Sequence, residues 1–411
     1  MQDSKLAVSQ VYKVFGNDAD GALRLLQQGK SKQEILAQTG ATVGVQDASF
    51  SVKEGEIFVV MGLSGSGKST LVRMLNGLIA PTAGQILIDG EDVASASPAA
   101  LRRIRREKIS MIFQHFALFP HWTLADNVAY GLKITGVPKD RRRARALEVL
   151  EQVGLAPWAD SLPSDLSGGM QQRVGLARGL AAGSDILLMD EPFGALDPLI
   201  RREMQTELLN LQQKLKKTIV FITHDLNEAL LLGNRIAIMK DGRIVQIGTA
   251  QEIVTAPADD YVAAFVADID RGRVFTADDV SSPATTLQLR QTSVRDALRM
   301  MEQGGSNALY VMDGLRVAGV VTYQQLAASE MDPSPTTTLQ DALITDFPTA
   351  DATTSLSDLY GAAGSGLPIA VTDDRERLVG VVEPSDVLAH LSGDAGAEIP
   401  QDKEQAHAQP R

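Results

Sequence analysis

The residues best suited to bind phosphate form one short run, in which glycines alternate with small residues ahead of a lysine: Gly62-Leu63-Ser64-Gly65-Ser66-Gly67-Lys68-Ser69. Glycines let successive backbone N–H groups turn toward phosphate oxygens, and a following helix adds the partial positive charge of its N-terminus. Lys68 would reach the β- and γ-phosphates, and the Ser69 hydroxyl would ligate magnesium. A glycine-rich turn with an unrelated lysine is the alternative interpretation.

Carboxylates and an imidazole follow two other apolar runs. Residues 186–189 lead into Asp190 and Glu191. There Asp190 can hold the water shell of magnesium, and Glu191 could polarise an attacking water. His224 follows the run 218–223, and Gln114 follows the run 109–113. Ligands gather at the carboxyl ends of parallel strands. For His224 and Gln114 a purely structural role stays open.

The elements that must position these residues are strands and helices in alternation. The apolar run Ile57–Met61 predicts a buried strand before the glycine-rich run, and apolar residues after it recur at helical spacing: Leu71, Met74, Leu75 and Leu78. Further strand-like runs alternate with helical stretches up to residue 275: Ile86–Ile88, Ile109–Phe113, Ile186–Met189, Thr218–Thr223 and Ile236–Met239. This alternation predicts an α/β fold with a mostly parallel sheet.

A second anion-binding feature precedes the two carboxylates. Residues 166–172 read Leu-Ser-Gly-Gly-Met-Gln-Gln and open a predicted helix, so Ser167 and two glycines supply donors at its N-terminus.

The order of these motifs closely resembles the ATP-binding cassette (ABC) ATPases. The family's motifs match, in sequence order, residues 62–69 (Walker A), Gln114 (Q-loop), 166–172 (signature), 186–191 (Walker B), 195–197 (D-loop) and His224 (switch histidine). All six occur in order and at plausible spacing within a resemblance that covers residues 5–270, which makes coincidence a poor explanation.

The resemblance implies ATP and Mg²⁺ as cofactors and a role for each matching residue. Phe15, or less favourably Tyr12, would stack on adenine. The remaining ATP-binding residues would be Gly62, Ser64, Gly65, Ser66, Gly67, Lys68, Ser69, Thr70, Gln114 and Asp190, with Ser167, Gly168 and Gly169 acting on the ATP of the opposite subunit of a homodimer. Metal ligation would fall to Ser69, Gln114 and Asp190, and catalysis to Glu191, His224 and Lys68. Met170 departs from the Gln of many members, with little expected loss.

Two regions lie outside these motifs. A polar insertion at about residues 17–44 contains Ser31-Lys32-Gln33-Glu34, a capping-box pattern that predicts a short helix ending at Gly40. The last third holds an internal repeat, in which residues 308–322 and 368–383 each predict two strands with a helix on either side. We expect a nucleotide-binding domain over 1–275, repeat modules over 281–330 and 336–391, and a polar, disordered tail over 392–411.

Composition narrows the class of protein. The 411 residues are 44% hydrophobic and 22% charged, as in ordinary soluble globular chains, and contain no cysteine. No apolar stretch approaches the length of a membrane span, and the N-terminus lacks the plan of a secretory signal. Of the net charge of −12, residues 281–411 carry −10, so no basic footprint for nucleic acid is expected.

The insertion, Met170 and the repeat together resemble the ATPase subunits of glycine betaine/proline betaine importers, with a pair of cystathionine-β-synthase (CBS) modules. That resemblance implies import of a compatible solute, a membrane permease and a substrate-binding protein as partners, and a location on the cytoplasmic face of the membrane. The CBS pair would regulate. It departs from the nucleotide-binding pattern, because Gln325 and Glu383 replace the usual Asp and Thr.

Three alternatives stay open: another cargo (choline, carnitine or another amino acid derivative), a soluble ABC ATPase that does not transport, and a sensing module whose cassette has lost catalysis. Two basic clusters, residues 102–108 and 139–145, are either solvated helix faces or surfaces that attract anionic lipid or the acidic C-terminal region.

Overall fold

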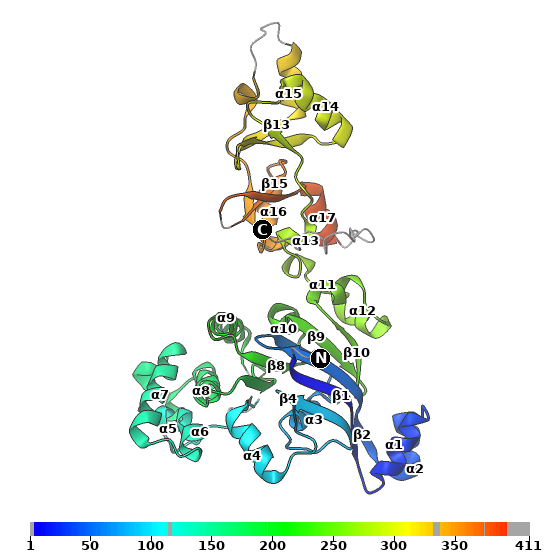
Figure 1. Cartoon of the computed structure of the whole chain (residues 1–411), viewed down its shortest axis with the longest axis vertical. Coiled ribbons are helices and arrows are strands. Elements are labelled where there is room, and N and C mark those ends of the chain that lie inside the picture. Colours follow the sequence, from blue (N-terminus) through cyan, green and yellow to red (C-terminus); the bar gives the residue numbers. More distant parts are fainter. Residues whose placement is uncertain (1–3, 114–116, 195, 332–337, 374, 393–411) are drawn as a thin grey trace. The chain divides into compact units, whose positions relative to one another are not determined.

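A computed structural model describes residues 4–113, 117–194, 196–331, 338–373 and 375–392. The chain divides into two compact units, Met1–Ala267 and Asp268–Arg411 (Figure 1). Within the described residues no helix combines the length and the apolar character that crossing a membrane requires.

The first unit is built on a six-stranded sheet that confirms the predicted α/β fold. Its strand order is β10-β9-β3-β8-β7-β6, and all neighbours are parallel except β10 and β9. The bounds are β3 Ile57–Met61, β6 Ile109–Ile112, β7 Ile186–Asp190, β8 Thr218–Thr223, β9 Arg235–Lys240 and β10 Arg243–Gly248. Every residue of β3, β7 and β8 is buried, which explains their unbroken apolar runs.

A second sheet in this unit was not predicted. It is antiparallel, in the order β2-β1-β4-β5, with bounds β1 Ser4–Phe15, β2 Thr42–Lys53, β4 Ala83–Ile88 and β5 Glu91–Asp92. The predicted strand Ile86–Ile88 is therefore real, but its assignment to the parallel sheet was wrong. The ring of Phe50 in β2 stacks on that of Phe58 in β3, with centroids 4.8 Å apart, so the two sheets share one core.

Helices flank the sheets on both sides. Next to the parallel sheet lie α3 Lys68–Leu75, α4 Pro98–Glu107, α9 Pro198–Leu215 and α10 Leu226–Leu232, followed by α11 Ala250–Thr255 and α12 Asp260–Val266. Helices α5 Leu124–Val128, α6 Tyr130–Ile134, α7 Lys139–Gln152 and α8 Gly168–Ala181 form a separate group beside the sheets (Figure 1). The predicted stripe along α3 was too long, because α3 ends at Leu75 and Leu78 is exposed.

The insertion folds into α1 Ala19–Gln27 and α2 Lys32–Thr39, which lie on the other side of the sheets from α5–α8 (Figure 1). The predicted capping box is present: Ser31 Oγ accepts from the Glu34 N–H, and Glu34 Oε2 accepts from the Ser31 N–H. Gly40 ends α2 with φ +67°, as predicted. The insertion also has a small core of its own, formed by Val14, Ala22, Leu26, Ile35, Ala41 and Val43.

The second unit contains the predicted repeat as two three-stranded sheets of the same topology. One holds β11 Thr286–Gln288, β12 Ala308–Asp313 and β13 Arg316–Thr322, and the other β14 Thr349–Asp351, β15 Ile369–Thr372 and β16 Leu378–Val382. Their helices are α14 Val294–Gly304, α15 Tyr323–Met331, α16 Leu356–Ala363 and α17 Pro384–Ser392, and the short α13 Ala277–Val280 precedes them. Of the predicted tail, Ser392 ends α17, and residues 393–411 lie outside the described residues.

The two halves of the repeat share a core. Ala308, Tyr310 and Val320 of the first half pack with Ala370 and Val381 of the second. The buried Tyr310 hydroxyl also donates to the Pro368 carbonyl at 2.5 Å. Neither half therefore buries its apolar face alone.

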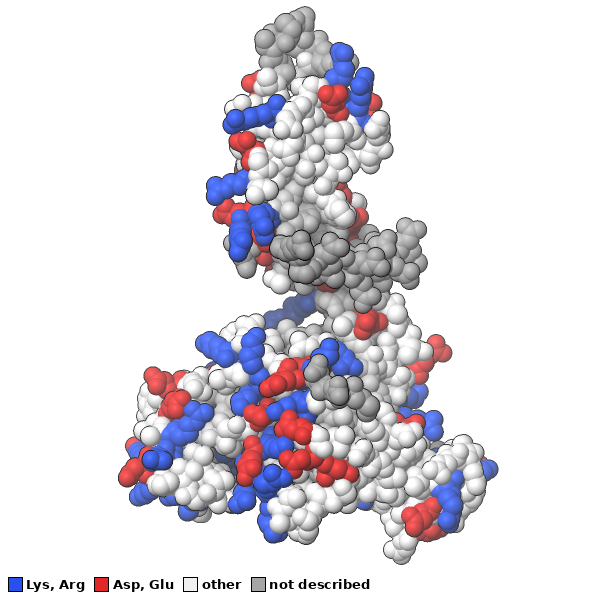
Figure 2. Space-filling view, viewed as in Figure 1, with Lys and Arg blue, Asp and Glu red and all other residues white. Residues whose placement is uncertain are grey.

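Some of the basic residues in each cluster of the first unit are paired with carboxylates. Arg103 contacts Glu91, and Lys108 lies 3.1 Å from Asp89 and 2.8 Å from Glu91. In the other cluster Arg143 meets Asp160 at 2.7 Å. Figure 2 shows charges of both signs interleaved on the visible face of this unit. This pairing favours the solvated-helix interpretation of both clusters.

Candidate active site

The glycine-rich run connects β3 to α3 and has the backbone conformation of a phosphate cradle. Gly62 has φ +153°, and a Cβ there would lie 2.2 Å from the Met239 carbonyl oxygen. Gly67 has φ +102°, and a Cβ there would lie 2.5 Å from the Gly44 carbonyl oxygen. Gly65 also has a positive φ of +80°, and Ser64 is exposed. Side chains at positions 62 and 67 would therefore displace neighbouring backbone, which only glycine avoids.

Lys68 opens α3 with its ammonium folded onto this loop. Its side chain is 5% exposed, and Nζ donates to the carbonyls of Gly62 at 2.8 Å and Leu63 at 3.0 Å. Desolvation lowers the pKa of Lys68, while the nearby charges of Glu191 and Asp190 oppose that shift. Glu191 Oε1 lies 3.9 Å away. A desolvated cation of this kind is well placed to pair with a phosphate.

Two further hydroxyls of the loop fit the phosphate and its metal ion. Ser66 Oγ is buried and has no hydrogen-bond partner among the described residues, so the loop has an unused polar atom. Ser69 Oγ donates to Asp190 Oδ1 at 3.1 Å. Burial raises the pKa of Asp190, and the Ser69 hydrogen bond partly offsets this. A hydroxyl beside a carboxylate supplies the oxygen ligands that magnesium prefers.

Glu191 and His224 meet at the carboxyl ends of neighbouring strands. His224 Nδ1 lies 3.1 Å from Glu191 Oε2. Glu191 has an uncommon φ of +46°, which its N–H maintains by donating to the Ile222 carbonyl at 3.0 Å. His224 is 57% exposed and Glu191 19%, so the pair faces solvent next to Lys68. The pair can orient and polarise a water molecule.

Arg201, which the sequence analysis did not identify, joins the loops that carry these residues. Its Nη2 donates to the Leu196 carbonyl at 3.1 Å, and its Nη1 lies 3.5 Å from Asp225 Oδ2. Leu196 follows β7, and Asp225 follows His224 directly. Asp197, between Leu196 and α9, caps that helix by accepting from the Leu199 and Ile200 N–H groups. The only sequence signal for a role of Arg201 is its position, one turn into α9 and close to the loop after β7.

The signature segment begins α8, as predicted, with Ser167 as the N-cap that accepts from the Met170 N–H at 3.4 Å. A Cβ at Gly169 would lie 2.5 Å from Cγ2 of Ile200, so this glycine permits close packing on α9. No hydrogen bond or ion pair within the described part of the chain joins Ser167, Gly168 or Gly169 to residues 62–69.

Phe15 lies beside the start of α3. Its Cε2 is 2.8 Å from the point where a Cβ of Gly44 would sit, and the methyl group of Thr70 is 3.4 Å from that point. The Phe15 ring is 41% exposed, with Lys13 Nζ 5.1 Å from its centroid. Tyr12 is half-buried, and its burial and the neighbouring Asp47 raise its pKa. Gln114 and Ala195 lie outside the described residues.

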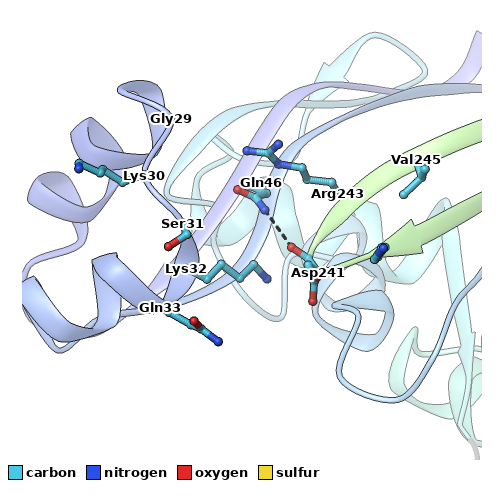
Figure 3. A pocket seen from close by; sticks show the side chains of 10 residues that line it. Gly29, Lys30, Ser31, Lys32, Gln33, Gln46, Asp241, Arg243 and Val245 are labelled. Carbon is cyan, nitrogen blue, oxygen red and sulfur yellow. Dashed lines mark hydrogen bonds between the residues drawn. The ribbon is translucent and has the colours of Figure 1, made fainter. Parts of the chain in front are cut away.

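A polar pocket of about 480 Å³ lies between the insertion and the β9–β10 turn (Figure 3). Gln46 Nε2 donates to the Asp241 carbonyl at 2.9 Å. Gly242 then donates its N–H to the Ser66 carbonyl at 2.9 Å and accepts from the Gln46 N–H at 2.8 Å. The turn Asp241-Gly242 thus contacts both the pocket and the phosphate loop.

Fold and site together define a P-loop ATPase of the ABC class. The ABC transporter family matches residues 45–194, and the CBS domain matches residues 277–331 and 334–393. A solved dimeric structure of an ATP-binding cassette in a post-hydrolysis state, bound to ADP and Pi, superposes with a TM-score of 0.50 at 32% identity, covering 60% of this chain and 98% of that chain.

Two curated relatives match over nearly their whole length. The glycine betaine/carnitine transport ATP-binding protein GbuA of Listeria monocytogenes is 50% identical to this chain. The match covers 95% of this chain and 98% of the GbuA chain. The glycine betaine/proline betaine transport system ATP-binding protein ProV of Salmonella typhimurium is 47% identical over 95% of this chain and 98% of its own. The chain therefore belongs to the ABC transporter ATPases, among ATP-binding transport subunits with C-terminal CBS domains. It is an enzyme that binds and hydrolyses ATP.

Proposed function

We propose that this ATPase powers the import of glycine betaine or a closely related compatible solute through a partner membrane permease. The observation that carries the proposal is the match to two transport subunits over almost the whole chain, both of which are named for glycine betaine. Proline betaine is a second cargo, and carnitine the leading alternative, since one relative is named for it. A substrate-binding protein would deliver the solute, and this chain would lie on the cytoplasmic face of the membrane.

In this proposal each site residue has a role, and for the described residues the geometry given above supports it. Lys68 and the loop from Gly62 to Ser69 hold the phosphates, with Phe15 against adenine. Ser69 and Asp190, with Gln114, would hold Mg²⁺, which supplies charge stabilisation on the phosphates. Glu191 accepts the proton of the attacking water, and His224 positions that water and the Glu191 carboxylate.

The proposal also includes a homodimer and a regulatory CBS pair. Ser167, Gly168 and Gly169 would complete the site on a second copy, which agrees with their lack of bonds to their own phosphate loop. The solved cassette at 32% identity is likewise dimeric. The CBS pair has its own core, contains no glycine-rich phosphate loop, and would modulate activity.

The decisive experiment is Glu191→Gln in the reconstituted transporter. ATP binding should persist, while hydrolysis and glycine betaine uptake fall by about 10²-fold or more, because the water loses its proton acceptor. ATP binding, phosphate release and uptake of glycine betaine, carnitine and choline are measured on the same preparations. Glu203→Gln, an exposed carboxylate on α9, is the matched control. Near-normal turnover would remove Glu191 from this role, and uptake of carnitine or choline without glycine betaine would change the cargo.

A further inference from the structure

The two halves of the CBS pair enclose a cleft that the proposed function does not use. Its volume is about 500 Å³, within the range of small-molecule sites. The first half contributes Asn307, Ala308, Thr322, Tyr323 and Gln324, and the second Gly366, Pro368, Glu383, Pro384 and Ser385. The Tyr310 hydroxyl of the first half donates to the carbonyl of Pro368, a lining residue of the second half, so a hydrogen bond joins the two halves at the cleft.

The charge of this cleft is negative. Among the described residues that line the cleft, Glu383 is the one carboxylate, and none is a lysine or an arginine. No ion pair or side-chain hydrogen bond is formed by Glu383 within the described residues. Burial, and then the charge of Asp386, raise its pKa. A partly buried carboxylate without a counter-charge is unfavourable, and a cationic ligand would relieve that cost.

The partial positive charges of the helix N-termini do not reverse the negative charge of the cleft. Both α15 and α17 begin at the cleft, and each contributes roughly half a positive charge. At α15 the Thr322 hydroxyl accepts from the Gln325 N–H at 3.4 Å, as an ordinary neutral cap. At α17 the corresponding residue is Glu383, whose full negative charge outweighs the helix dipole. A phosphate in this cleft would lie against that carboxylate.

The lining also indicates an organic cation in preference to a metal ion. In the described part of the chain no three His, Asp or Glu side chains are grouped so that they could hold a metal. Tyr323 is an aromatic residue among those that line the cleft; it is 38% exposed, and its hydroxyl donates to Glu302 Oε1 at 3.0 Å. That bond fixes the ring and places a second carboxylate at its edge. Aromatic faces and carboxylates together recognise alkylammonium groups.

We propose that this cleft binds a small organic cation, a quaternary ammonium or protonated amine, with Glu383 as its counter-charge and the Tyr323 ring as an apolar wall. The proposal goes beyond the proposed function and does not depend on the cargo. It assigns the CBS pair a ligand class opposite in charge to a nucleotide.

The test is calorimetric titration of the full-length protein with choline, with ethanolamine, and with 3,3-dimethyl-1-butanol, the neutral carbon isostere of choline. At least one of the two cations should bind tenfold or more tightly than the isostere. Glu383→Gln should weaken that binding about tenfold or more. Glu376→Gln makes the same charge change in the other cleft between the halves, which also contains Arg316, and should leave the affinity unchanged.

The comparison of choline with its isostere needs no variant, so it stays decisive if Glu383→Gln folds poorly. Equal binding of the cations and the isostere would overturn the proposal. So would no binding of either cation, or unchanged affinity in a folded Glu383→Gln protein. Displacement of a bound cation by AMP, with AMP binding tighter than either cation, would show that the cleft is a nucleotide site.

Discussion

Arg201 connects the loop that follows β7 to the loop that follows β8. One guanidinium nitrogen donates to the Leu196 carbonyl and another lies near the Asp225 carboxylate. His224 immediately precedes Asp225, and Glu191 immediately follows β7. The relative position of the Glu191 and His224 side chains therefore depends on a residue that touches neither of them.

Arg201→Lys should lower the turnover number about tenfold while the KM for ATP changes by less than about twofold. Lysine keeps the charge but lacks the planar fork of guanidinium nitrogens, so it reproduces the two contacts with poorer geometry, and small displacements of reacting groups are costly. Arg202→Lys, at the exposed neighbouring position, should leave both constants unchanged. Steady-state ATPase kinetics measure both variants. A rise in KM without loss of turnover would place Arg201 in ATP binding instead.

The residues proposed to contact phosphate or water could be picked out from the sequence, whereas the residues that support them could not. Lys68, Asp190 and Glu191 belong to short motifs whose residue types and spacing follow from their chemistry. Gly242 belongs to no motif. Its need for glycine arises because a Cβ would lie 2.7 Å from the Gly44 carbonyl oxygen, on a strand distant in sequence. Such requirements come from tertiary contacts, which local patterns do not contain.

At the scale of elements, α2 depends on its capping box. Hydrogen bonds from the Ser31 backbone N–H, the Ser31 hydroxyl and Lys30 lower the pKa of Glu34 to about 2. A carboxyl whose pKa is lower in the folded state stabilises the fold above its unfolded pKa. That contribution is lost as pH falls from about 4.5 through about 2.

An NMR titration should place the Glu34 carboxyl midpoint near pH 2. Ser31→Ala should move the midpoint upward, toward the ordinary value for glutamate, because the hydroxyl bond is lost. Gln33→Ala, an exposed change in the same turn, should leave it in place. A Glu34 midpoint near the ordinary value in the unmodified protein would show that the capping box does not persist in solution.

The antiparallel sheet shows the limit of prediction for elements. In β2 the residues Val43, Val45, Ala48, Phe50 and Val52 are buried, and most of their neighbours are exposed. Alternation of this kind indicates a strand with one buried face. Glycine, aspartate and serine between the apolar residues make the run look like a loop when it is judged by composition. Its partner β1 lies across the insertion in sequence, so the pairing was not visible locally.

At the scale of the molecule, two active sites should form only when two chains meet. Mixing Lys68→Ala chains with Ser167→Arg chains leaves one composite site of the mixed dimer unmutated, while the other site carries both changes. Affinity-purified mixed dimers should therefore trap about one ATP per dimer under slow-turnover conditions. Neither homodimer should trap a comparable amount.

If each chain completed its own site, every site of the mixed dimer would carry one change and trapping would be lost. Photo-crosslinking supplies an independent measurement. A nucleotide analogue bound by Lys68 should label the signature segment of the other chain. Labelling of Ser167 in the same chain as that Lys68 would contradict the shared-site arrangement.

The turn Asp241-Gly242 sets a limit on how this protein can diverge. Gly242 donates a hydrogen bond to the phosphate loop and accepts one from β2, and the site has no room for a side chain. An extra residue here would shift Ser66 away from the nucleotide, whatever sequence it had. The length of the turn between β9 and β10 is therefore constrained by the position of the phosphate loop.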